Sequence, residues 1–98
     1  MSKLPPVHPG EILREEFLVP FGLSAGKVAA AIGVPRTRIE RLAKQEVDLS
    51  PDTALRLARF FKTSPAFWMG IQSRYALENA EDAIKGELEK IEPMRELA

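Results

Sequence analysis

The chain has 98 residues, of which 45% are hydrophobic, and it contains one histidine, one tryptophan and no cysteine. This length fits one small domain and excludes larger enzyme scaffolds such as a TIM barrel or a Rossmann unit with a substrate domain. The lack of cysteine excludes a disulfide framework, and a lone histidine cannot build a histidine-rich metal site. No apolar run approaches the roughly 18 residues of a membrane span, and the N-terminus lacks a secretory apolar stretch. We therefore expect a cytoplasmic domain without cofactor, bound metal or membrane partner.

The charges are separated along the chain, although the formal net charge is zero. Residues 24–62 carry eight basic and four acidic side chains, an excess of four positive charges. Residues 77–98 carry seven acidic and three basic side chains, an excess of four negative charges. Because phosphate binding responds to the local field, the middle of the chain suits a nucleic acid. Ordinary solvated surface charge is the alternative interpretation of the same pattern.

The first predicted helix follows a proline-rich segment, residues 1–8, which we expect to be a flexible arm. Pro9 suits the first turn of a helix, because proline lacks the N–H that would have no partner there. One apolar helical stripe follows, formed by Ile12, Leu13, Phe17 and Leu18. Pro20 and Gly22 are expected to end this helix.

Two short helices joined by a tight turn are predicted next. Ser24 is a strong N-cap, and the helix that it opens runs to Ile32, where Gly33 stops it because glycine accepts a positive φ. Pro35 begins a second helix that continues to about Gln45. The expected buried face of this second helix is Ile39, Leu42 and Ala43.

The same signature of serine followed by proline occurs twice more, at Ser50–Pro51 and at Ser64–Pro65. Each predicts the start of a helix, and the second of these helices carries the aromatic pair Phe67 and Trp68. Such a pair at helical spacing is expected in the core rather than in a ligand pocket. A last helix is predicted from Glu78 to Ile91, where Pro93 follows. Because no segment shows the alternation of a strand, the fold class is predicted to be all-α, with five or six helices.

The stretch from Ala25 to Gln45 has the spacing of a helix-turn-helix motif. Ala29 lies four residues before Gly33 and lets the second helix cross closely, while Val34 pins the second helix against the first. A helical hairpin without a role in DNA binding shares part of this spacing.

The exposed face of the second helix in this motif is basic. A recognition helix reads bases in the major groove through its N-terminal part, and arginine matches guanine. The predicted base contacts are therefore Arg36, Thr37, Arg38 and Arg41. The predicted contacts to the DNA backbone are Ser24, Lys27, Lys44 and Gln45. Glu40 would repel a phosphate, so we expect it to accept a hydrogen bond from cytosine or to hold a neighbouring arginine. The alternative is a solvated face stabilised by i,i+4 ion pairs.

Catalysis is not expected, and we predict that the chain is not an enzyme. His8 has no visible partner that would make it an acid or a base, and no phosphate-binding loop, HExxH motif or EF-hand loop is present in the sequence. Arg56 and Arg59 are expected on a solvated helix face.

The domain organisation is predicted as two parts. Residues 1–76 form a DNA-binding helix-turn-helix domain with a short N-terminal arm, and residues 77–98 form an acidic helical extension. The extension has an amphipathic stripe of Ala80, Ala83, Ile84, Leu88 and Ile91. We expect this stripe to pack on the core, with a dimer seam or a surface for a basic toxin as the alternatives.

Four sequence blocks occur in an order and spacing that resemble a known family: His8–Phe17, Gly33–Ile39, Leu49–Ala58 and Thr63–Trp68. The family is the HigA antitoxins, also described as VapI-type proteins, of the Xre/Cro-like (lambda-repressor-like) helix-turn-helix group. The resemblance covers about residues 7–77. It implies a bacterial cytoplasmic protein with a five-helix DNA-binding domain. It also implies a homodimer that binds operator DNA and represses its own HigBA-type operon, and a RelE-like mRNA-cleaving toxin as the partner.

One segment departs from the family pattern. The family often ends its recognition helix with Asn-Gly and a basic residue, whereas this chain has Lys44, Gln45 and Glu46. The loop that leads to Ser50 is therefore expected to differ. The alternatives to an antitoxin are a stand-alone regulator of the same fold without a toxin and a helical interaction module that has lost DNA binding.

Overall fold

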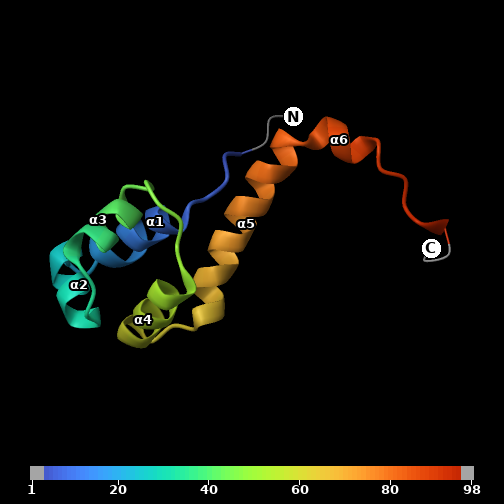
Figure 1. Cartoon of the computed structure of the whole chain (residues 1–98). Coiled ribbons are helices and arrows are strands. Elements are labelled where there is room, and N and C mark those ends of the chain that lie inside the picture. Colours follow the sequence, from blue (N-terminus) through green and yellow to red (C-terminus); the bar gives the residue numbers. More distant parts are fainter. Residues whose placement is uncertain (1–3, 96–98) are drawn as a thin grey trace.

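The computed structural model describes residues 4–95, and every regular element in that range is helical. Figure 1 shows α1 to α4 gathered into one unit, from which α5 leaves as a long rod that carries α6. The elements in chain order are α1 (Pro9–Ile12), the π-helix η1 (Leu13–Leu18), α2 (Ala25–Ile32), α3 (Arg36–Ala43), α4 (Pro51–Phe61), α5 (Pro65–Ala83) and α6 (Lys85–Glu89). The all-α fold class predicted from the sequence is confirmed.

Serine side chains cap the starts of α2, α4 and α5, as the sequence predicts. In each cap the serine Oγ accepts a hydrogen bond from the backbone N–H three residues later, and so satisfies one of the free N–H groups of the first turn. The three N–H···Oγ pairs are Lys27 to Ser24 at 3.1 Å, Thr53 to Ser50 at 3.2 Å and Phe67 to Ser64 at 3.0 Å.

The first predicted helix consists of two parts with different hydrogen bonding. Its first turn, α1, is α-helical, and η1 continues it as a π-helix in which the Val19 N–H donates to the carbonyl of Arg14 at 3.0 Å. The wider turn keeps both Leu13 and Leu18 buried, although they lie five residues apart. A π-helical segment has no signal in the apolar periodicity, so the sequence did not reveal it.

His8 caps α1, which corrects the expectation that it belongs to a flexible arm and has no partner. Its Nδ1 accepts a hydrogen bond from the Gly10 N–H at 2.9 Å, and the buried ring lies edge-on to the ring of Tyr75, with centroids 4.7 Å apart. Burial lowers the pKa of His8, while the negative charge of Asp48 and a backbone hydrogen bond at Val47 act in the opposite direction. Residues 1–3 of the predicted arm lie outside the described residues.

The core lies where α1 to α4 meet the first turns of α5. The predicted inner face of α3 is buried, and Trp68 is fully buried with its indole N–H donating to the hydroxyl of Thr63 at 2.8 Å. Phe67 is 42% exposed, so the prediction of a core position is confirmed for Trp68 and is wrong for Phe67. The largest fully buried side chains besides Trp68 are Leu13, Ile39, Leu42, Leu57, Val28 and Pro9.

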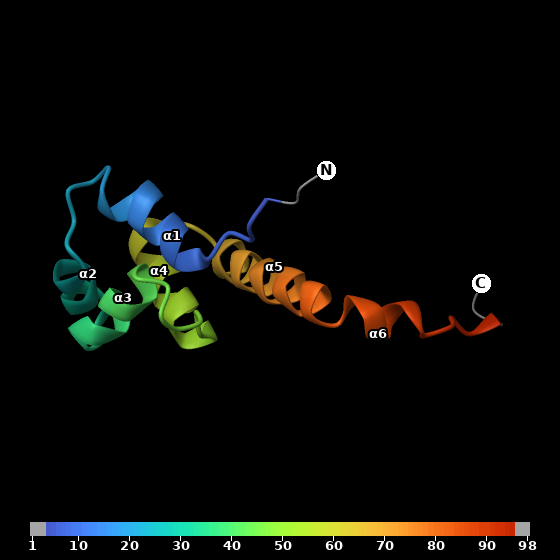
Figure 2. The same cartoon turned by 90° about the horizontal axis from the view of Figure 1, so that it is seen from above.

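The acidic C-terminal segment does not pack on this core, contrary to expectation. α5 runs without a break through residue 77 to Ala83, and the chain bends at Ile84 (φ −116°, ψ 20°) before α6 begins, so the single helix predicted over Glu78–Ile91 is wrong. Figure 2 shows α5 and α6 directed away from the unit formed by α1 to α4. The exposed apolar side chains of this segment include Leu77, Ile84, Leu88 and Ile91. The division of the chain at residues 76 and 77 falls within a continuous helix and stays a prediction.

Candidate nucleic-acid interface

The helix-turn-helix predicted from the sequence is formed by α2 and α3. Gly33 follows α2 with φ 74° and ψ 39°, a left-handed conformation that glycine adopts without steric cost. The Val34 N–H then donates to the carbonyl of Ala29 at 3.0 Å, which closes the turn. Pro35 is the N-cap of α3 and Arg36 its first residue, one position later than the sequence suggests.

Two contacts from the N-terminal segment hold the C-terminal end of α3 in place. A Cβ atom at Gly10 would overlap the carbonyl oxygen of Leu42, so only glycine allows α1 to approach α3 this closely. The guanidinium of Arg14 donates to the carbonyl of Ala43, one of the carbonyls that a helix end leaves without an internal partner. These contacts fix the orientation of α3 relative to the core.

The predicted contact residues are all exposed, and three of them line one groove. Arg36, Thr37, Arg38 and Arg41 are all exposed on α3, and the last three line a groove between α3 and residues 47–53. A Cβ at Gly26 would lie 3.0 Å from the Cδ of Arg36, which places the first turn of α2 beside the start of α3. The predicted backbone contacts are exposed as well: Ser24, Lys27, Lys44 and Gln45.

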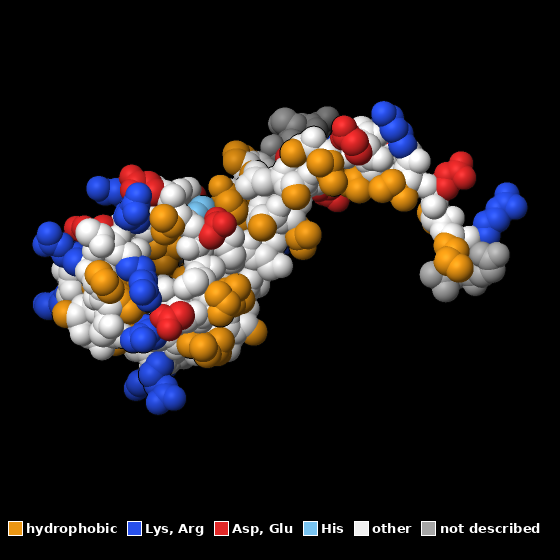
Figure 3. Space-filling view, viewed as in Figure 1, with side chains coloured by type: hydrophobic (Ala, Val, Ile, Leu, Met, Phe, Trp, Pro, Cys, Tyr) orange, Lys and Arg blue, Asp and Glu red, His pale blue; other side chains and the backbone are white. Residues whose placement is uncertain are grey.

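The lysine and arginine side chains on the face drawn in Figure 3 gather mainly over the helices of the α1–α4 unit, far from the C-terminus. This agrees with the excess of basic residues between positions 24 and 62. Such a local excess attracts a polyanion although the net charge of the whole chain is zero.

Each of the three arginines on α3 has an acidic partner. Glu40 lies 3.5 Å from Arg36, Asp52 lies 3.0 Å from Arg38, and Glu46 lies 3.8 Å from Arg41, measured between the charged atoms. All of these side chains are well exposed, and such pairs contribute about 0–1 kcal/mol. Because these pairs are weak and leave other N–H donors of each guanidinium free, they do not prevent the arginines from binding DNA. Of the two expectations for Glu40, the contact with a neighbouring arginine is present in the structure, and the contact with cytosine stays a prediction.

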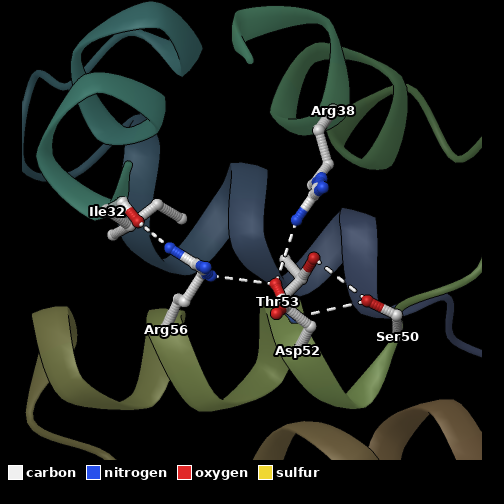
Figure 4. A network of polar contacts seen from close by, with 6 residues as sticks. All are labelled: Ile32, Arg38, Ser50, Asp52, Thr53 and Arg56. Atoms are coloured by element: carbon white, nitrogen blue, oxygen red, sulfur yellow. Dashed lines mark hydrogen bonds and ion pairs between the residues drawn. The ribbon is translucent and has the colours of Figure 1, made fainter. Parts of the chain in front are cut away.

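Asp52 and Arg56 form a network that the sequence interpretation missed (Figure 4). Arg56 donates to Asp52 at 2.8 Å and to the carbonyl of Ile32 at 2.7 Å, so it ties α4 to the end of α2. Arg56 and Arg59 are exposed, as expected, but the Arg56 cation also lies beside the free carbonyl at a helix C-terminus. Asp52 and Arg56 lie four residues apart on one helix, and this i,i+4 spacing is the sequence signal that could have predicted their ion pair.

The end of α3 differs from the predicted boundary. The helix ends at Ala43, Lys44 is its C-cap, and Gln45 takes a left-handed conformation with φ 63°. Gln45 thus fills the position at which a glycine is usual, and its N–H donates to the carbonyl of Leu42 at 2.9 Å. The unusual loop expected at this point therefore still makes a helix-ending turn.

Within residues 4–95, the structure contains no helix that is both long enough and apolar enough to cross a membrane.

Comparison with known proteins identifies the family. The Helix-turn-helix family matches residues 13–68. Virulence-associated protein I of Dichelobacter nodosus is 44% identical over 80 residues, which are 82% of this chain and 74% of that protein. Antitoxin HigA-1 of Vibrio cholerae is 32% identical over 93 residues, 95% of this chain and 88% of that protein. The structure described as Pseudomonas aeruginosa antitoxin HigA with higBA promoter matches with a TM-score of 0.87 and 41% identity, covering 91% of this chain and 98% of that chain. The chain therefore belongs to the Xre-type helix-turn-helix family and, within it, to the HigA-like antitoxins.

Proposed function

We propose that this protein is a transcriptional repressor that binds operator DNA in a sequence-specific way and serves as the antitoxin of a HigBA-type operon. The observation that carries the proposal is the exposed, arginine-rich face of α3, a helix that hydrogen bonds tie to η1 and to α4. The relation to an antitoxin HigA whose structure contains the higBA promoter supports it.

In the proposed complex, α3 lies in the major groove. Arg36, Thr37, Arg38 and Arg41 contact base edges, because the first residues of a recognition helix lie deepest in the groove. The backbone contacts are assigned to the exposed residues Ser24 and Lys27, at the start of α2, and Lys44 and Gln45, which follow α3. Two copies of the chain act as a homodimer, with their α3 helices about 34 Å apart on a near-palindromic operator.

The partner of the antitoxin is proposed to be a RelE-like mRNA-cleaving toxin. A protein that binds RNA carries a basic surface, and residues 77–98 supply seven acidic against three basic side chains. The exposed apolar side chains of the same segment, including Ile84 and Leu88, have no cover from the core. The acidic segment is thus available for a basic partner.

Fluorescence anisotropy tests the repressor function. The purified protein is titrated into a labelled duplex from its own upstream region and into a scrambled duplex, over a series of salt concentrations. We expect a clear preference for the upstream duplex and an affinity that falls steeply with salt, because phosphate contacts release counterions. Equal affinity for both duplexes would refute sequence-specific repression and leave nonspecific DNA binding or protein–protein interaction as the function.

Single substitutions separate the two groups of contacts. Arg38→Ala should weaken operator binding by about 1–3 kcal/mol and relax the sequence preference at one base pair. Lys44→Ala should weaken binding to all duplexes to a similar extent and reduce the salt dependence. Uniform weakening by Arg38→Ala would instead assign Arg38 to a phosphate.

Co-purification tests the antitoxin function. The full-length protein should retain a small basic protein encoded beside it, and a variant that ends at residue 83 should lose that protein while it still binds the operator. Retention by the shortened variant would place the toxin surface within residues 1–83 instead.

A further inference from the structure

Asp52 bridges two arginines that come from different helices. It is the second residue of α4, and its Oδ1 accepts hydrogen bonds from Arg38 of α3 at 3.0 Å and from Arg56 of α4 at 2.8 Å. Figure 4 shows the guanidinium groups of Arg38 and Arg56 approaching Asp52 from two sides. Asp52 itself is 58% exposed, so it is not buried as a core contact.

The position of Asp52 is fixed from outside α3. Arg56 donates at the same time to Asp52 and to the carbonyl of Ile32, the last residue of α2. A chain of hydrogen bonds therefore joins the end of α2, the start of α4 and the exposed face of α3, and it runs through Ile32, Arg56, Asp52 and Arg38. The guanidinium of Arg38 is aimed by α2 and α4 and not only by its own helix.

This contact leaves Arg38 able to bind DNA. A guanidinium has five N–H donors, and Asp52 engages it through one nitrogen, Nη1. The side chain of Arg38 is 44% exposed and lines the groove beside α3. An arginine that is already held at one edge has less conformational freedom to lose when its other edge meets a base.

The sign of the charge at position 52 is unfavourable for simple attraction to DNA. A carboxylate in the middle of a basic surface repels phosphates, and its removal should strengthen binding if charge were its only effect. Its two bonds to arginines instead indicate a geometric role.

We propose that Asp52 is a specificity-determining positioning residue, which orients the Arg38 guanidinium for one base pair of the operator. This inference rests on the proposed function, because it concerns how the same surface reads DNA. Asp52 acts through Arg38 and does not touch the base itself.

The test measures discrimination at single base pairs. Fluorescence anisotropy gives the affinity of the full-length protein for the upstream duplex and for duplexes in which each base pair is replaced in turn. The base pair read by Arg38 is identified by comparing two proteins. Its replacement weakens binding by the wild-type protein but does not weaken binding by the Arg38→Ala variant. Asp52→Asn should lower discrimination at that same base pair about three- to tenfold and leave it unchanged elsewhere, since one good base contact is worth roughly tenfold or more.

Two further variants provide matched controls. Asp48→Asn removes the same charge from the same groove, where Asp48 lies exposed and, among the described residues, forms no ion pair with Arg38, so it should preserve discrimination at every base pair. Asp52→Glu keeps a carboxylate within reach of both arginines and should restore most of the discrimination that Asp52→Asn loses. The thermal midpoint of each variant shows whether the fold is intact.

Two outcomes would overturn the inference. If Asp52→Asn and Asp48→Asn both tighten binding to all duplexes equally, Asp52 acts through its charge alone. If Asp52→Asn reduces discrimination at all base pairs together with a lower thermal midpoint, Asp52 supports the fold in general. A wild-type protein without any preference for the upstream duplex would instead refute the proposed function, so the two failures are distinguishable.

Discussion

Substitution of Gly10 by alanine tests how the first helix holds the DNA-binding helix. Gly10 lies in α1, and a Cβ atom built there would overlap the carbonyl oxygen of Leu42 and lie 2.9 Å from its carbonyl carbon. Both atoms belong to the backbone of α3, so no side-chain rotation can relieve the overlap. Either α1 must move outward or the last turn of α3 must shift.

The expected magnitude follows from two opposing effects. Alanine in place of glycine within a helix ordinarily stabilises a protein by about 0.5–1 kcal/mol, because the unfolded chain loses freedom. Overpacking of a tight contact costs about 1–3 kcal/mol, and a backbone neighbour places this case at the upper end. We expect the free energy of unfolding to fall by about 2–2.5 kcal/mol in the Gly10→Ala variant.

Urea unfolding followed by circular dichroism measures this change, and Gly70→Ala is the matched control. Gly70 lies in the middle of α5, where an added Cβ would have no atom within 4 Å, so the same substitution should stabilise by about 0.5–1 kcal/mol. Operator binding should weaken in Gly10→Ala, because the C-terminal end of α3 is displaced. Equal stabilisation by both substitutions would refute the packing argument.

Three further predictions concern single side chains. Gln45→Gly should raise the free energy of unfolding in urea by roughly 0.5–1 kcal/mol, because glutamine is strained at φ 63°. Burial lowers the pKa of His8 in the folded chain, so on acidification the unfolded chain takes up the proton at a higher pH than the folded chain does. The free energy of unfolding should therefore decline as the pH falls below about 6.5. His8→Asn keeps a capping acceptor and should flatten this decline in urea titrations from pH 7.5 to 5; an unchanged slope would exclude His8 as its source. Trp68→Phe should reduce stability by about 1–3 kcal/mol, since it leaves the Thr63 hydroxyl without its indole donor; a smaller effect than that of Phe67→Leu would contradict this.

The helix starts and the inner face of α3 could be predicted because their signals are local. A serine cap followed by proline acts on the backbone of its own turn, and this placed the starts of α4 and α5 correctly. Gly33 marked the turn of the motif for the same reason, since only its own φ is involved. The exposure of Arg36, Thr37, Arg38 and Arg41 on α3 followed from helical periodicity.

The contacts that join distant segments could not be predicted in this way. The bond from Arg14 to the carbonyl of Ala43 spans 29 residues, and the ion pair of Arg38 with Asp52 spans 14. No spacing rule connects such positions, because they depend on how the helices pack. The extended C-terminal segment was mispredicted for a related reason: its amphipathic stripe shows that it needs a partner surface but not that the partner is the chain's own core.

Methylation protection is the most direct test of the central claim that the arginines of α3 read bases in the major groove. Dimethyl sulfate methylates guanine N7, which lies in that groove and is the atom that arginine contacts. We expect bound protein to protect guanines in two clusters about one helical turn apart, with Arg38→Ala and Arg41→Ala each restoring reactivity at one position per cluster. Tight binding to the upstream duplex without protection of any guanine N7, or with protection that the arginine variants leave intact, would contradict the claim.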